Sequence, residues 1–144
     1  MIRAHALAPL AVAAALVAAP VLAQDRTPAP DGARAYIISP EDGAKVTSPV
    51  EFRFGLEGME VAPAGTEEAN TGHHHLIVDI PEDGYDFDGP IPSDAQHIHF
   101  GGGQKEASVE LAPGEHTVWL LLGDANHVPH DPPVISEPVT ITVE

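Results

Sequence analysis

Seven of the nine histidines of this chain lie in three short segments. The segments are His73–His75, His97–His99, and the pair His127 and His130. Neutral imidazole is the commonest metal ligand in proteins. On a β-strand, residues i and i+2 project from the same face, so His73 would lie beside His75 and His97 beside His99. The spacing therefore predicts that two imidazoles of each strand segment can reach one metal ion.

The elements that would position these histidines are predicted to be short strands. From residue 33 onward, apolar runs alternate with turn residues, and the 15 prolines interrupt most helical windows. The predicted strands are 35–39, 50–56, 73–80, 97–100, 107–111, 116–122 and 134–143. About seven strands separated by turns indicate an all-β fold, an immunoglobulin-like antiparallel β-sandwich, although the Cys…Trp…Cys spacing is absent. A small barrel is the alternative.

An up-and-down strand order brings the three histidine segments to one end of this sandwich. The strand that contains Trp119 would end at the His127 loop, and the strand of His99 would end on the same side, at Gly101–Gly103. The strand that begins at His73 would start there. His116 begins its strand at the opposite end, so we interpret it as structural.

Six histidines are therefore candidate metal ligands: His73, His75, His97, His99, His127 and His130. Three or four of them can bind one ion. His74 faces the other way along its strand and is expected to be packed or hydrogen-bonded. Met59, in a loop at the same end, could be a soft axial ligand for copper, but a packing role is favoured. Asp124 could orient an imidazole or cap its own loop.

The chain contains no cysteine, which excludes disulfides, thiolate metal sites and cysteine catalysis. Sites made of imidazole without thiolate suit Cu(II), Zn(II) and Ni(II), and we expect Cu(II) or Zn(II) here. The 22 acidic residues against six Lys and Arg give a formal charge of −16. Such a chain repels nucleic acid and attracts cations. Acidity also keeps a protein soluble, so the charge alone does not indicate a site.

The N-terminal 23 residues are predicted to be a signal peptide. Arg3 supplies a positive charge, residues 6–22 are almost wholly apolar, and Val21-Leu22-Ala23 suits cleavage after Ala23. This predicts a periplasmic or secreted protein with no membrane span after cleavage, because no second apolar run of membrane length follows. Residues 24–32 are expected to be a flexible tether, and residues 33–144 a single domain.

The histidine motifs also carry a resemblance to a known family. The segments Asn70–Leu76, His97–Gln104 and Leu122–His130, in this order, resemble the exported bacterial family called domain of unknown function 4399. The resemblance extends over roughly residues 35–143. It implies an exported domain with histidine motifs and brings no activity with it.

The function that these observations favour is an exported metal-binding protein that handles copper or zinc. One alternative is a metal-dependent enzyme that uses the same histidines. The chain has no His-Glu-x-x-His motif, serine nucleophile elbow or paired carboxylates in a recognisable context, so an enzyme is the less favoured reading and no catalytic residue is assigned. The other alternative is a metal-free interaction or adhesion module. The sequence identifies no protein partner.

Overall fold

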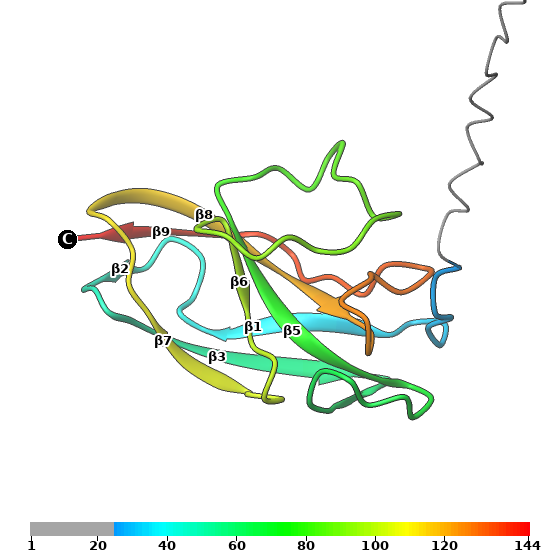
Figure 1. Cartoon of the computed structure of the whole chain (residues 1–144). Coiled ribbons are helices and arrows are strands. Elements are labelled where there is room, and N and C mark those ends of the chain that lie inside the picture. Colours follow the sequence, from blue (N-terminus) through cyan, green and yellow to red (C-terminus); the bar gives the residue numbers. More distant parts are fainter. Residues whose placement is uncertain (1–24) are drawn as a thin grey trace, which may run out of the picture.

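The computed structural model describes residues 25–144, so the predicted signal peptide lies outside the described residues. Within that range the chain forms strands and loops only, and the prediction of an all-β sandwich is confirmed (Figure 1). The strands are β1 (Arg34–Ser39), β2 (Lys45–Val46), β3 (Val50–Glu57), β4 (Glu60–Val61), β5 (Thr71–Val78), β6 (His97–His99), β7 (Glu106–Val109), β8 (Gly114–Gly123) and β9 (Val139–Val143). Seven correspond to the predicted strands. The other two, β2 and β4, have two residues each.

Two sheets make up the fold. The smaller sheet has the order β1-β3-β7, and the larger has the order β2-β9-β8-β5-β4, with β6 also paired to β5. The long strands pair antiparallel, whereas the short β2 and β4 pair parallel with β9 and β5. Strand β5 is therefore central, with β8 along one edge and β4 and β6 along the other.

The main hydrophobic core lies between the two sheets. Strand β3 contributes Phe52 and Phe54, and alternate residues of β5 and β8, such as Leu76 and Leu120, pack against them. The intervening residues of β5 and β8 face away from this core. There, Ile77 packs with Trp119, Leu121 and Ile91 under the loop 79–96. Strand β5 is thus buried on both faces, which lets histidines at odd positions be buried outside the main core.

The last predicted strand, 134–143, is corrected by the structure. Only β9 is regular, while the Ser136 N–H donates to the Leu120 carbonyl and the Leu122 N–H donates to the Val134 carbonyl. Pro138 separates these two stretches, because it has no N–H to donate and cannot continue the ladder. Both stretches still lie beside β8.

The expectation of a flexible tether at residues 24–32 is corrected for its described part. The Ala29 N–H donates to the Asp131 carbonyl at 3.0 Å, and the Asp131 N–H donates to the Thr27 carbonyl at 2.9 Å. These bonds form a parallel bridge between Pro28 and Asp131. The segment is therefore attached to the loop that follows β8.

Within residues 25–144, no helix has the length and apolar character needed to cross a membrane.

Candidate metal centre

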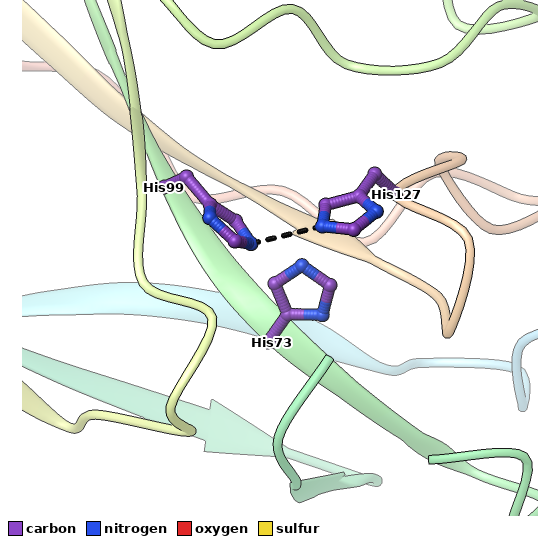
Figure 2. A group of neighbouring side chains, drawn as sticks. All are labelled: His73, His99 and His127. Carbon is purple, nitrogen blue, oxygen red and sulfur yellow. Dashed lines mark hydrogen bonds between the residues drawn. The ribbon is translucent and has the colours of Figure 1, made fainter. Parts of the chain in front are cut away.

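The histidine segments meet on the outer face of the larger sheet, at the end where β5 begins and β8 stops. In the sheet register His75 lies opposite His99, and His73 lies opposite Gly123. The loop after β8 then carries His127 back over this face. Figure 2 shows the rings of His73, His99 and His127 directed toward one another from three separate parts of the chain.

Three of these imidazoles have the spacing of a metal-binding group. One ring nitrogen from each of His73, His99 and His127 lies within 4.8 Å of the others. The Nε2 atoms of His99 and His127 are 3.1 Å apart. Two imidazole nitrogens on a tetrahedral ion with metal–nitrogen bonds of about 2.0–2.1 Å would be about 3.3 Å apart. The His99–His127 pair is therefore already at coordination distance, and a ring nitrogen of His73 lies within 4.8 Å of both.

His75 supplies a fourth ring beside this group. Its ring centroid lies 4.7 Å from that of His73, 5.1 Å from that of His99 and 6.1 Å from that of His127. Neither of its ring nitrogens has a hydrogen-bond partner among the described residues, although the side chain is buried. His75 is thus adjacent to the three-histidine group and farthest from His127.

Burial favours the neutral form of three of these imidazoles, those of His73, His75 and His99. Desolvation, reinforced by the neighbouring His127 and His99, lowers the pKa of His73 to about 4. Stronger desolvation, together with His73 and His99, lowers the pKa of His75 to about 2. The pKa of His99 is lowered for the same reasons, first by burial and then by His127. Because only neutral imidazole has a free lone pair, the site is prepared to bind a cation at neutral pH.

Two glycines make room for the rings. A Cβ atom at Gly101 would lie 2.3 Å from Cε1 of His99, and a Cβ atom at Gly123 would lie 2.7 Å from Cε1 of His75. Neither distance is compatible with van der Waals contact. The glycine run after β6 and the final residue of β8 therefore let the imidazoles lie directly against the backbone.

The remaining candidate ligands lie outside this group. Nδ1 of His97 is 2.8 Å from Oδ1 of Asp94, and His97 lies opposite Ile77, two positions from the His75–His99 pair. His130 is buried, and its Nε2 is 3.3 Å from the Thr71 carbonyl oxygen. The structure thus groups three of the six predicted ligands, His73, His99 and His127, places His75 beside them, and leaves His97 and His130 with other contacts.

Three further histidine or methionine side chains have the packing or hydrogen-bonding roles that the sequence favoured: His74, Met59 and His116. His74 faces the main core, with its ring centroid 5.4 Å from that of Phe54. Met59 is buried against Leu122 and Val134. At the far end of β8, Nδ1 of His116 is 2.7 Å from Oδ2 of Asp79, and its Nε2 is 2.7 Å from the Ala112 carbonyl oxygen.

Some residues that hold His127 had no signal in the sequence. The Ile91 N–H donates to the His127 carbonyl at 2.7 Å, which connects the acidic loop 79–96 to the site. The Thr27 hydroxyl donates to Oδ2 of Asp124 at 2.6 Å. Both contacts join segments far apart in the chain, so no local pattern could reveal them.

Comparison with known proteins identifies the family without an activity. The sequence profile described as domain of unknown function (DUF4399) matches residues 52–144, which contain every histidine of the centre. No curated protein and no solved structure matches the chain. The chain therefore belongs to the DUF4399 family.

Proposed function

We propose that this protein binds a divalent transition-metal ion, Cu(II) or Zn(II), through His73, His99 and His127, with His75 as the fourth ligand. The observation that carries the proposal is the convergence of three imidazole nitrogens within 4.8 Å. Their segments are far apart in the sequence, so chance clustering along the chain does not explain the group.

The unpaired nitrogens support this proposal. Nε2 of His73 and both ring nitrogens of His75 are buried without a hydrogen-bond partner among the described residues. Buried polar atoms are nearly always paired, and an unpaired one costs about 1–3 kcal/mol. A metal ion at the centre of the rings would use these lone pairs and offset that cost.

The donor set favours copper or zinc. The four rings offer only nitrogen, and Met59 packs against Leu122 and Val134, so no sulfur ligand joins them among residues 25–144. Imidazole sites of this kind suit Zn(II) and Cu(II), and intrinsic affinity is generally highest for Cu(II).

The fourth ring favours binding over catalysis. Catalytic zinc sites commonly have three protein ligands and keep an open position for water. Here the buried ring of His75 lies beside His73 and His99, where it could complete the coordination from within the protein. With the predicted signal peptide, the proposed role is metal binding and handling in the periplasm or outside the cell.

Thermal unfolding of tag-free protein tests the proposal. The protein would be stripped with a chelator and titrated with Cu(II), Zn(II) or Ni(II). A ligand at about a hundred times its Kd stabilises the folded state by about 2.7 kcal/mol, which raises Tm by on the order of 10 °C for a domain of this size. His73→Ala with His99→Ala should abolish the shift, and His116→Ala, at the far end of β8, should retain it. No shift with any of the three metals would refute the proposal.

A further inference from the structure

The loop that presents His127 is organised around one buried carboxylate. Oδ1 of Asp124 accepts hydrogen bonds from the N–H groups of Asn126 at 2.8 Å and Val128 at 3.0 Å. The backbone of Asp124 adds two more bonds, because its N–H donates to the Val128 carbonyl and its carbonyl accepts from the His127 N–H. Asp124 therefore fixes the backbone on both sides of His127.

This fixation holds His127 in an uncommon conformation. His127 has φ of 64°, in the left-handed region that residues other than glycine seldom adopt. Such a conformation costs on the order of 1 kcal/mol and persists only where surrounding contacts impose it. The bonds from Asp124 are among the contacts that impose it, together with the bond from the Ile91 N–H to the His127 carbonyl.

The second oxygen of Asp124 is held by the segment before β1. Thr27 donates its hydroxyl to Oδ2 of Asp124 at 2.6 Å. We call residues 26–29 the N-terminal strap, because both of its ends bond to the same loop. Arg26 donates to the carbonyls of Pro129 and His130, and the Ala29 N–H donates to the Asp131 carbonyl. The strap thus contacts the loop both at the Asp124 carboxylate and at the backbone of residues 129–131.

We infer that Thr27 and Asp124 are positioning residues for the metal centre, which act by holding His127 beside His99. The inference rests on the proposed function. It adds that the affinity for the metal depends on a segment that contributes no ligand. By thermodynamic reciprocity, metal binding stabilises the docked strap by the same free energy that the docked strap adds to metal binding.

Thr27→Val is the sharpest test, because it removes the hydroxyl and keeps the shape of the side chain. Substitutions that disturb the orientation of a metal-ligating histidine typically weaken binding about 10–100-fold. We expect the Kd for Cu(II) or Zn(II), measured by competition with a chelator, to rise about tenfold in Thr27→Val. Thr140→Val is the matched control. Its hydroxyl bonds to that of Thr117 at 3.3 Å, in the β8–β9 pairing beside His116 and away from the histidines of the metal centre, so the Kd should not change.

Asp124 allows a graded version of the same test. Asp124→Asn retains an oxygen for the two backbone N–H groups, and its amide can donate to the Thr27 hydroxyl. Asp124→Ala removes all three bonds of the carboxylate, those from Asn126, Val128 and Thr27. We expect Asp124→Asn to bind metal nearly as well as the parent and Asp124→Ala to bind it less tightly than Thr27→Val. The Cu(II) EPR spectrum should change in Asp124→Ala, since one ligand moves, whereas a purely structural role would lower Tm and leave the spectrum unaltered.

A metal-free measurement separates this inference from the proposed function. In the stripped protein, NMR contacts between the ring protons of His99 and His127, and the slow exchange of the Val128 amide, should be lost in Asp124→Ala and weakened in Thr27→Val. If the parent binds no metal, the proposed function fails and these signals still decide whether the two residues position His127. Unchanged ring contacts and unchanged affinity in both variants would overturn the inference.

Discussion

The Nε2 atoms of His99 and His127 lie 3.1 Å apart, although the two residues are 28 positions apart in the sequence. One of these nitrogens must carry a proton if the pair is hydrogen-bonded, and neither needs one if both bind the same ion. If both Nε2 atoms carried protons, the two N–H groups would repel each other at this distance. The pair is therefore stable either with a single shared proton or with a bound cation.

Single substitutions should distinguish the histidines that bind the metal from histidines that only lie nearby. His127→Ala removes one member of the three-histidine group and should raise the Kd for the metal more than about 100-fold. That factor is the upper end of the effect of replacing a residue that only orients a ligand. His97→Ala is the control, because His97 bonds to Asp94 and lies outside the group. The Kd of this variant for the metal should match that of the parent. Isothermal titration or chelator competition would measure both. A loss of binding in His97→Ala would show that the ligand set is different.

Gly101 should be required for the position of the His99 imidazole. In Gly101→Ala the new methyl group would lie 2.3 Å from Cε1 of His99, so the ring must move and the affinity should fall by about tenfold. Gly102→Ala meets only the end of the flexible Gln104 side chain, at 3.1 Å, and should bind metal like the parent. Chelator competition on the two variants would measure the difference. Equal affinities would show that His99 does not need its present position.

His74 should be replaceable without loss of the site. Its ring is buried in the main core, and neither nitrogen has a hydrogen-bond partner among the described residues. His74→Leu removes the cost of two unpaired polar atoms, so the free energy of unfolding of the metal-free protein should rise by about 1–3 kcal/mol. Urea unfolding would measure it. Metal affinity should not change, because this side chain faces away from the other rings. A destabilised variant would indicate that a hydrogen-bond partner stabilises the His74 imidazole.

Acid should destabilise the metal-free protein through its buried histidines. Burial lowers the pKa of His73 and of His74 to about 4, against about 6.5 in the unfolded chain. Between these values the unfolded state binds more protons, so the free energy of unfolding falls as the pH decreases from about 6.5 to about 4. Each unit of lowered pKa corresponds to about 1.4 kcal/mol. Urea unfolding at a series of pH values would show the decline, and it should be shallower in His74→Leu. An unchanged slope in that variant would contradict the assignment for His74.

Much of the fold could be predicted because strand formation has a local signal. The strict alternation in residues 50–56 predicted β3, and the His-x-His spacing placed His73 with His75 and His97 with His99 on common faces. The resemblance to the family was confirmed over residues 52–144. The gathering of His segments at one end followed from antiparallel order alone. These inferences use the two-residue period of a strand and the reversal of direction at each turn.

Which histidines meet was decided only by the tertiary structure. The register sets His99 opposite His75 and leaves His97 opposite Ile77, where Asp94 is its partner. The loop conformation turns His127 toward His99 and leaves His130 against Thr71. The strap that holds this loop was expected to be a tether, because its local sequence has turn residues and no apolar period.

The sequence by itself determined the strands, the common faces and the supply of imidazole without thiolate. The tertiary structure decided the grouping of the rings, the burial that lowers the pKa of His73, and the contact of Thr27 with Asp124. The physical reason is that side-chain direction within a strand depends on local backbone geometry. Register, loop conformation and desolvation depend on contacts between residues far apart in the chain, and these exist only once the sheets have packed.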